Sequence, residues 1–463
     1  MATYYHSNAS LLRFSPLYIR TGALGAVLAL IGILCNVYAF TLSRPSGEGV
    51  LGASPLNTIQ STAVQIGAML FSLAALFIII SVVLYKILPD TVRITMMVRR
   101  GLFHPSRGNP LHLKEGELLP RIRCEHVGEG LYDLIISAQQ GVTTDNLSSS
   151  IPSISAALNR RFQRYAVVAS ETDSAFNFVT FRLNDVQVDR SITFQCVEDM
   201  RPQSPTLLSV DKVTSIDLMT SGSILVAGKT RSGKTTGVIA LLLQILSCGH
   251  DDYGSIVTII DPKQAELSRL SHTVTLDADG EAQAILAALK NYSATITRRQ
   301  HILNDLSEER GDVVKWWDAG FHPSFVFIDE YVACRSIFPK KAPKDTDYCL
   351  DTFDSLLKRI VTMGASAGCF VIISIAEASV QDGGLPAMLR SAMSTRVLFR
   401  PTRAEGLLMW DKEKLDPLPE RIYGPGDAWF SSTDGIHDTV SCVHFPKFEF
   451  PVYQELGRLL QAY

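Results

Sequence analysis

The 463-residue sequence predicts an α/β protein whose main domain is a P-loop NTPase built on a parallel sheet. Three observations predict it: two long uncharged segments near the start, a phosphate-binding motif at residues 228–235, and apolar strands that alternate with helices from about residue 222 onward. We expect an N-terminal tail with two transmembrane helices over residues 1–90, a small α+β domain over 91–210 and the NTPase domain over 211–463.

The composition excludes several classes of protein. Hydrophobic residues make up 46% of the chain and charged residues 19%, so there is enough apolar surface to offset the entropy of folding and the chain is not disordered. The net charge of −3 excludes a uniformly basic nucleic-acid coat but leaves room for a local basic channel. Eight cysteines without C-x-x-C spacing argue against a zinc site or a disulfide framework.

Both uncharged segments, at about residues 21–42 and 63–85, are long enough to cross a membrane. Thr21–Leu42 and Ala63–Tyr85 each exceed the roughly 20 residues that a helix needs to span the hydrocarbon core. The alternatives are a cleaved signal peptide for the first and a buried core helix for the second, and the length of both segments argues against these. Small residues within the two segments suit close helix packing in lipid: Gly22, Gly25, Gly32 and Gly67.

Basic residues flank the two segments unevenly. Arg13 and Arg20 precede the first, the connecting loop of residues 43–62 carries only Arg44 and Glu48, and several follow the second: Lys86, Arg93, Arg99, Arg100 and Arg107. Since positive residues stay inside, we expect a protein of the cell membrane with both termini cytoplasmic. From Lys86 to Arg123 eight basic and three acidic residues give a local charge of +5, a basic collar that suits either anionic lipid or nucleic acid.

Residues 91–210 combine short strand-like and helix-like segments and show no chemistry of their own. A helix is expected over Ile154–Tyr165, with Ser153 as its N-cap. β-Branched and aromatic content predicts strands at residues 93–98, 132–137, 165–170, 176–183 and 191–197.

The remaining sequence predicts a parallel sheet that is covered on both faces, because continuous apolar strands alternate with helices. Closing strands are expected in the last 60 residues, followed by a final helix near residues 453–460. The expected strands are 223–228, 255–261, 325–329, 370–375 and 396–400, and the expected helices are 235–246, about 280–305, 353–364 and 386–393.

The phosphate-binding motif reads Gly228-Lys229-Thr230-Arg231-Ser232-Gly233-Lys234-Thr235 and is followed by Thr236. An apolar strand precedes it and an apolar helix follows, which is the context that this motif requires. Its glycines let the backbone wrap a phosphate, and its N–H groups and the helix N-terminus supply partial positive charge. We expect Lys234 to reach the β- and γ-phosphates of a nucleotide and Thr235 to ligate Mg²⁺.

A second motif, FVFIDE at 325–330, places Asp329 and Glu330 at the carboxyl end of a central strand. We expect Asp329 to hold Mg²⁺ through water, and Glu330 to orient and deprotonate the attacking water. The alternative is an acidic strand end that caps the next turn. Glu330 is the residue that extends the prediction from nucleotide binding to hydrolysis.

Together these segments resemble the FtsK/SpoIIIE family of membrane-anchored, ring-forming DNA translocases. The resemblance covers about residues 222–400 well and 91–210 loosely. It implies a RecA-like P-loop NTPase fold, ATP and Mg²⁺ as cofactors, ATP hydrolysis and a homohexamer. The segments that carry it are GKTRSGKTT (228–236), IIDPKQAELS (259–268), Arg298-Arg299, FVFIDEY (325–331), GASAG (364–368) and STRVLFR (394–400).

The sequence departs from chromosome-segregating members in its layout. It has two rather than four expected membrane helices and lacks the long linker and the C-terminal winged-helix module. This layout resembles the TcpA-like coupling ATPases of Gram-positive conjugative elements. That resemblance implies DNA bound by sequence-independent backbone contacts, a relaxase and conjugation channel proteins as partners.

The sequence also departs from the family at two positions of the motor. Residues 375–378 read Ile-Ala-Glu-Ala where the family has a Thr-Gln-Arg-Pro run, and Ala365 stands where the family has an arginine. The resemblance therefore does not assign the residues that sense the γ-phosphate. Three arginines are candidates for reaching a neighbouring subunit's nucleotide, with an ordinary salt bridge as the alternative for each: Arg359, Arg396 and Arg400.

We therefore expect a membrane-anchored, ATP-driven DNA translocase that delivers DNA to a conjugative channel. One alternative is the ATPase of a protein secretion system, although such proteins usually carry several motor domains. Another is a nucleotide-gated docking module for a relaxase–DNA complex. Arg298 and Arg299 are candidate DNA contacts, with packing of the helix that carries them as the alternative.

Overall fold

A computed structural model describes residues 4–6, 17–42, 55–104, 109–139, 141–158, 162–248, 256–270, 272–376, 385–416, 418 and 422–461. Arg13, Arg44, Glu48 and Arg107 of the expected charge pattern and residues 377–378 of the altered motif lie outside them. The chain divides into two compact units, Met1–Val186 and Gln187–Tyr463. The expected domain boundary at residues 210–211 stays a prediction.

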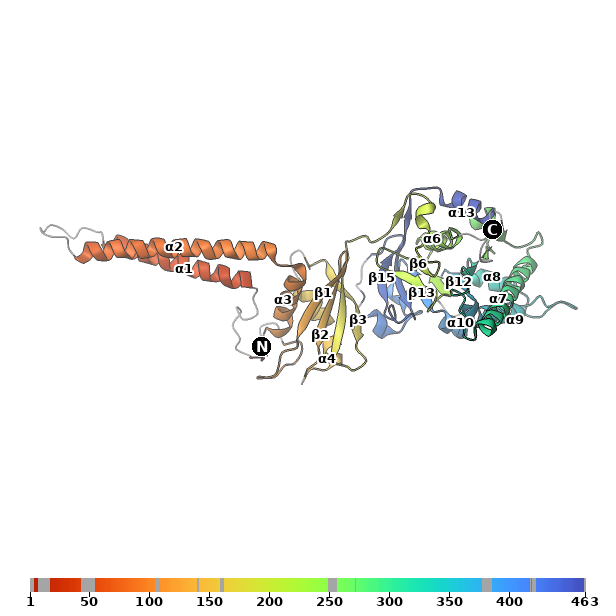
Figure 1. Cartoon of the computed structure of the whole chain (residues 1–463), viewed down its shortest axis with the longest axis horizontal. Coiled ribbons are helices and arrows are strands. Elements are labelled where there is room, and N and C mark those ends of the chain that lie inside the picture. The colour runs from red at the N-terminus through yellow and green to blue at the C-terminus, as the bar shows by residue number, and fades with distance from the viewer. Residues whose placement is uncertain are drawn as a thin grey trace. The chain divides into compact units, whose positions relative to one another are not determined.

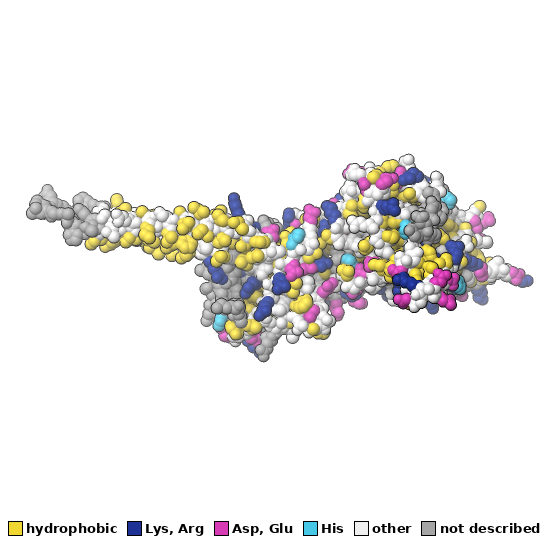
Figure 2. All heavy atoms as spheres, viewed as in Figure 1, with side chains coloured by type: hydrophobic (Ala, Val, Ile, Leu, Met, Phe, Trp, Pro, Cys, Tyr) yellow, Lys and Arg dark blue, Asp and Glu magenta, His cyan; other side chains and the backbone are white. Residues whose placement is uncertain are grey.

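The first unit begins with two long apolar helices, α1 (Leu17–Leu42) and α2 (Pro55–Ile87), which pack against each other. Both are long and apolar enough to cross a membrane, and Figure 2 shows hydrophobic side chains along their surface. Small residues make the contact close: a Cβ on Gly25 would lie 3.1 Å from the carbonyl oxygen of Ala74, and one on Gly32 would lie 3.3 Å from that of Gly67. The glycines therefore lie where the helices touch, as expected for packing in lipid.

The small α+β domain is an antiparallel sheet of order β1-β2-β4-β3 with helix α3 packed on it. Its core joins Val98 and Leu102 of α3 to Leu134 and Phe181 of the sheet. The elements are α3 (Asp90–Phe103), β1 (Ile122–Gly128), β2 (Leu131–Ser137), α4 (Thr144–Ser148), α5 (Ile151–Ala157), β3 (Tyr165–Thr172) and β4 (Phe178–Asp185).

Two predictions for this domain are wrong. The strand expected at 93–98 is part of α3, because Ile94, Val98 and Leu102 recur every four residues and bury one helix face. The helix expected at 154–165 is α5, which ends at Ala157 and has Ser150 rather than Ser153 at its N-cap position. Sequence reasoning also missed β1, whose mostly exposed and partly charged sequence lacks a strand-like apolar run.

The second unit begins with short strands that join its core. The strand expected at 191–197 is reduced to β5 (Thr193–Phe194), which pairs with β16 (Lys447–Phe448). A second short pair follows, formed by β6 (Leu207–Ser209) and β7 (Ser215–Asp217). Phe194 and Leu208 are buried in the same hydrophobic cluster as the central sheet.

The central sheet has eight strands in the order β10-β9-β11-β12-β8-β13-β14-β15. The first six are parallel, as expected, while the two closing strands β14 and β15 extend the same sheet in antiparallel pairing. The strands are β8 (Ile224–Ala227), β9 (Val257–Ile260), β10 (Thr273–Val274), β11 (Ser324–Ile328), β12 (Cys369–Ile375), β13 (Thr395–Phe399), β14 (Asp427–Ser432) and β15 (Ser441–His444).

Helices cover the two faces of this sheet, which explains why every residue of β8, β11 and β12 is buried. Helix α6 packs against α13 and α7 packs against α9, and the two pairs lie apart in Figure 1. The helices are α6 (Lys234–Leu246), α7 (Gln283–Arg310), α8 (Tyr331–Ile337), α9 (Leu350–Met363), α10 (Ala387–Ala392), α11 (Arg403–Gly406), α12 (Lys412–Leu415) and α13 (Val452–Gln461).

The order of the strands determines where the motifs meet. β11 lies between β9 and β12, and β8 lies between β12 and β13. Because the carboxyl ends of parallel strands share one edge of a sheet, the loops after β8, β9, β11 and β12 gather at that edge.

Arg299 is a structural residue of this fold. Its side chain is buried (3% exposed) and donates hydrogen bonds to the carbonyl oxygens of Ala367, at 3.0 Å, and His322, at 2.9 Å. The guanidinium also lies over the ring of Phe321, 5.0 Å from its centroid. The hypothesis that Arg299 contacts DNA is therefore wrong, whereas Arg298 on the same helix is exposed.

We expect Arg299→Gln to lower the free energy of unfolding by about 3 kcal/mol, because buried carbonyl oxygens lose their charged donor. Thermal unfolding of the full chain checks this, with Arg298→Gln as the matched control that leaves the midpoint unchanged. Equal midpoints for the two variants would contradict the structural role of Arg299.

Candidate nucleotide-binding site

The phosphate loop connects β8 to α6 through three residues with left-handed backbone. These are Gly228 (φ +150°), Arg231 (φ +62°) and Gly233 (φ +93°). A Cβ on Gly228 would lie 2.9 Å from the Cβ of Phe399, and one on Gly233 would lie 2.7 Å from the backbone nitrogen of Gly426. Both glycines are therefore required by conformation and by close approach.

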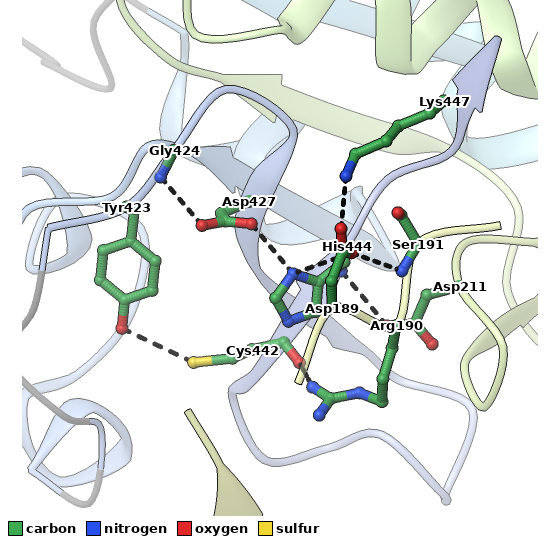
Figure 3. Close-up of polar contacts among 10 residues, drawn as sticks. All are labelled: Asp189, Arg190, Ser191, Asp211, Tyr423, Gly424, Asp427, Cys442, His444 and Lys447. Atoms are coloured by element: carbon green, nitrogen blue, oxygen red, sulfur yellow. Dashed lines mark hydrogen bonds and ion pairs between the residues drawn. The ribbon is translucent and has the colours of Figure 1, made fainter. Parts of the chain in front are cut away.

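The turn at Gly424–Asp427 supports the phosphate loop from behind. The N–H of Gly426 donates to the carbonyl oxygen of Ser232 at 3.0 Å. Asp427 holds the turn, since its carboxylate accepts from the N–H of Gly424 at 2.9 Å and lies 2.9 Å from Nδ1 of His444 (Figure 3). The loop thus rests on the backbone of a segment nearly 200 residues away in the sequence.

Further polar contacts connect the segment that follows this turn, residues 442–447, to the start of the second unit. Asp211 accepts from the N–H of His444 at 3.2 Å, and buried Arg190 donates to the carbonyl oxygen of Cys442, also at 3.2 Å (Figure 3). Asp189 pairs with Lys447. Sequence reasoning missed this network, because its members are far apart in the chain and match no local motif.

One cavity of about 430 Å³ brings the predicted site residues together. Lys234, Thr235, Asp329 and Glu330 all line it. Of the other loop residues, Gly228 and Ser232 do not line it, and Ser232 is almost fully buried. Lys229, Thr230, Arg231, Gly233 and Thr236 border the same space.

Asp329 and Glu330 follow β11 at the shared edge of the sheet, and the N–H of Asp329 donates to the carbonyl oxygen of Ile260 at 2.9 Å. Burial raises the pKa of Asp329, and the positive charge of Lys234 opposes that rise. Burial also lowers the pKa of Lys234, against the attraction of Glu330. A cation and two acids thus share one desolvated space.

Both carboxylate oxygens of Glu330 are occupied. Oε1 accepts from the N–H of Ala376 at 3.0 Å, and Oε2 lies 3.1 Å from Nζ of Lys263 and 3.7 Å from Nζ of Lys234. Lys234 also donates to the carbonyl oxygen of Ile375 at 3.1 Å. Glu330 itself has a left-handed backbone (φ +60°), which is uncommon outside glycine.

Lys263 is a site residue that sequence reasoning did not identify. Its segment contributes to the family resemblance, but no role followed from the spacing alone. In the structure the buried carboxylate of Asp261 accepts from the N–H groups of Lys263 (3.1 Å), Ala265 (2.9 Å) and Ser268 (3.0 Å). This turn brings Lys263 to the cavity, where it meets Glu330.

The donor set fits Mg²⁺. Thr235 offers a hydroxyl and Asp329 a carboxylate to the same cavity, and Mg²⁺ prefers such oxygen ligands in combination with substrate phosphates. Their roles as metal ligands stay predictions.

None of the three candidate arginines lines the cavity. Arg396 donates to the carbonyl oxygens of Met409, at 2.6 Å, and Arg390, at 3.1 Å. Arg400 donates to the carbonyl oxygen of Tyr423 at 3.3 Å. Arg359 is exposed and donates to the hydroxyl of Thr297 at 2.8 Å. A role for any of them on a neighbouring subunit stays a prediction.

This chain is similar to one protein family and to several known proteins. The family model of FtsK/SpoIIIE matches residues 197–336. The FtsK domain-containing protein YdcQ of Bacillus subtilis (strain 168) is 26% identical over 151 residues, which are 32% of this chain and 28% of that protein. The DNA translocase FtsK of Helicobacter pylori (strain J99) is 26% identical over 231 residues, which are 48% and 25% of the two chains. The chain thus spans about a quarter of the length of these relatives.

Solved structures with similar folds include the pCW3 conjugation coupling protein TcpA in its monomer form with ATPγS. Its TM-score is 0.46 at 15% identity, over 73% of this chain and 92% of that one. ATPases 2 and 3 of EssC from Geobacillus thermodenitrificans give a TM-score of 0.42 at 15% identity, over 59% and 51% of the two chains.

The fold and the sequence match lead to one assignment. The chain has a mixed α/β fold of the P-loop NTPase kind, with the phosphate loop, the Asp261 turn and the acidic end of β11 around one cavity. All three lie within the matched segment. The chain is therefore similar to the FtsK/SpoIIIE family over residues 197–336.

Proposed function

We propose that this protein is a membrane-anchored ATPase that translocates DNA, and that it serves as the coupling protein of a conjugative transfer channel. The observation that carries the proposal is one cavity in which a phosphate loop, a cation and two acids meet, within the segment that matches the FtsK/SpoIIIE family. Two apolar helices before that domain, each long enough to cross a membrane, would provide the anchor.

ATP would bind with its phosphates against the N–H groups of the loop and the N-terminus of α6. Lys234 would leave the carbonyl of Ile375 for the β- and γ-phosphates, since a phosphate offers it more charge than a carbonyl oxygen. Thr235 and Asp329 would hold Mg²⁺, which neutralises phosphate charge when it is bound.

Hydrolysis would depend on Glu330, the acid nearest to the two lysines. As a general base it would accept a proton from the water that attacks the γ-phosphate. In the present arrangement Oε2 is shared between Lys263 and Lys234, and Oε1 accepts from Ala376. Movement of Lys234 to the phosphates would free one side of Glu330 and leave Lys263 as its remaining cationic partner.

DNA would be held through its backbone, because a translocase must contact every sequence alike. Arg298 is exposed on α7 and is available for such a contact. A homohexamer would surround the DNA, and a relaxase and channel proteins would be its partners at the cell membrane, with both termini cytoplasmic. Transport of protein, or docking without transport, are the competing functions.

We expect Gly233→Ala to weaken ATP binding by about 10- to 100-fold, because the new Cβ strains a left-handed residue and meets Gly426. Titration with a fluorescent ATP analogue checks this. Gly280→Ala is the matched control, since Gly280 also has positive φ (+77°) but no atom lies within 4 Å of the added Cβ. Equal loss in both variants would contradict the close approach.

ATP hydrolysis by a soluble piece starting near residue 91 tests the motor, measured with and without DNA. We expect DNA to stimulate hydrolysis. Lys234→Ala should abolish ATP binding, whereas Glu330→Gln should retain binding and lower the rate by about 10²- to 10⁴-fold. Hydrolysis that is indifferent to DNA would favour protein transport, and ATP binding without hydrolysis would favour the docking module.

Lys263→Met should raise the rate of hydrolysis without DNA severalfold and leave ATP affinity unchanged, because Glu330 loses the cation that occupies Oε2. Steady-state kinetics measure both quantities. Lys290 lies on α7 and pairs with Asp347, away from the cavity. Lys290→Met should change neither the rate of hydrolysis nor the affinity for ATP. A lower rate in Lys263→Met would show that Lys263 instead holds Glu330 in its productive position.

A further inference from the structure

A second cavity, of about 490 Å³, lies in the small α+β domain, and nothing in the proposed motor uses it. Three arginines line it: Arg99 on α3, and Arg121 and Arg123 at the start of β1. Its volume is typical of a site for one small ligand or headgroup. Among the described residues that line this cavity, none is Asp or Glu.

The positive charge of this cavity has little compensation. Arg99 is half-buried, and burial alone lowers its pKa. Within the described part of the chain its side chain has no hydrogen bond or ion pair, whereas Arg182 on β4 makes two hydrogen bonds of 2.9 Å to Asp133. Arg123 is mostly exposed and lies 3.8 Å from Glu125. An anionic ligand would supply the negative charge that balances these arginines.

The same cavity is apolar on its other walls. Leu118, Leu119, Ile122, Ile135 and Phe178 contribute carbon surface next to the arginines. Phe178 is 39% exposed, although it is a large hydrophobic side chain. A ligand that fits both surfaces carries a phosphate group and a hydrocarbon part. A nucleic-acid backbone offers the phosphate without the hydrocarbon.

The position of the cavity in the chain identifies the source of such a ligand. Helix α3 begins at Asp90, three residues after the apolar helix α2 ends at Ile87. At 1.5 Å per residue, Arg99 lies only about 14 Å along α3 from its first residue. If α2 spans the membrane, the cavity is tethered close to the phospholipid headgroups.

The structure also divides the basic collar of residues 86–123 into two kinds of cation. Arg93 is buried, donates to the carbonyl oxygen of Tyr85 and lies over the Tyr85 ring, 4.9 Å from its centroid. Its role is therefore structural. Arg99, Arg121 and Arg123 are separated by up to 24 positions in the sequence but converge on one cavity.

We propose that this cavity binds the headgroup of an anionic phospholipid. The three arginines would contact the phosphate diester, and the apolar wall would contact the glycerol and first acyl carbons. Such a site would give the domain an affinity for anionic membrane beyond that of its apolar helices.

Lipid binding by the full-length chain in non-ionic detergent tests this, measured by native mass spectrometry with phosphatidylglycerol and with phosphatidylcholine. The test variant combines Arg99→Gln, Arg121→Gln and Arg123→Gln. The matched control combines Lys86→Gln, Arg100→Gln and Lys114→Gln, which remove equal charge from the same collar outside the cavity lining. Thermal unfolding shows whether each variant is folded, and Arg99→Gln alone serves if the triple variant is not.

We expect the test variant to bind phosphatidylglycerol at least about tenfold more weakly, with the control close to the parent protein. Arg99→Gln alone should show a smaller loss in the same direction. Equal loss in the control would overturn the proposal in favour of diffuse attraction by the collar. Equal binding of phosphatidylcholine, which carries the same phosphate diester but no net charge, would overturn the preference for an anionic headgroup. Displacement of the lipid by a DNA oligonucleotide would assign the arginines to nucleic acid instead.

Discussion

The close backbone contact between Gly233 and Gly426 is the constraint on which the nucleotide site depends. A single methyl group at residue 233 would lie 2.7 Å from the nitrogen of Gly426. The backbone of the turn at residues 424–427 therefore constrains the conformation of the phosphate loop. The hydrogen bonds of Asp427 to Gly424 and His444 in turn hold this turn in place. This arrangement explains why the two antiparallel strands β14 and β15 matter to a site that lies on the parallel part of the sheet.

The chemistry of the site follows from charges crowded into a desolvated space. Lys234 and Glu330 are both largely buried, and each reduces the cost of burying the other. Lys263 adds a second cation, and the Asp261 turn delivers it. Because both oxygens of Glu330 have partners, the proposed base is restrained until Lys234 moves. Binding of a nucleotide is the event that would draw Lys234 away.

The sequence predicted the parts of this site that depend on local pattern. The phosphate loop, the acidic end of β11 and the apolar parallel strands each follow from a short motif or from periodicity, and the structure gathers them at one edge of the sheet. Their assigned roles in binding and hydrolysis stay predictions. The partner of Glu330 could not be predicted, because Lys263 reaches it only through the three N–H groups held by Asp261. The supporting turn at Gly424 likewise depends on pairing across nearly 200 residues. In the small domain, the β-branched residues at 93–98 favour a strand. The structure forms a helix there because it buries every fourth residue against the domain core, which the local sequence does not show.

The claim that this chain moves DNA is tested most directly by displacement of streptavidin from the ends of biotinylated single- and double-stranded DNA. We expect displacement that requires ATP, that fails with a non-hydrolysable analogue and that weakens as the salt concentration rises. ATP hydrolysis at full rate with no displacement from either kind of DNA would contradict it.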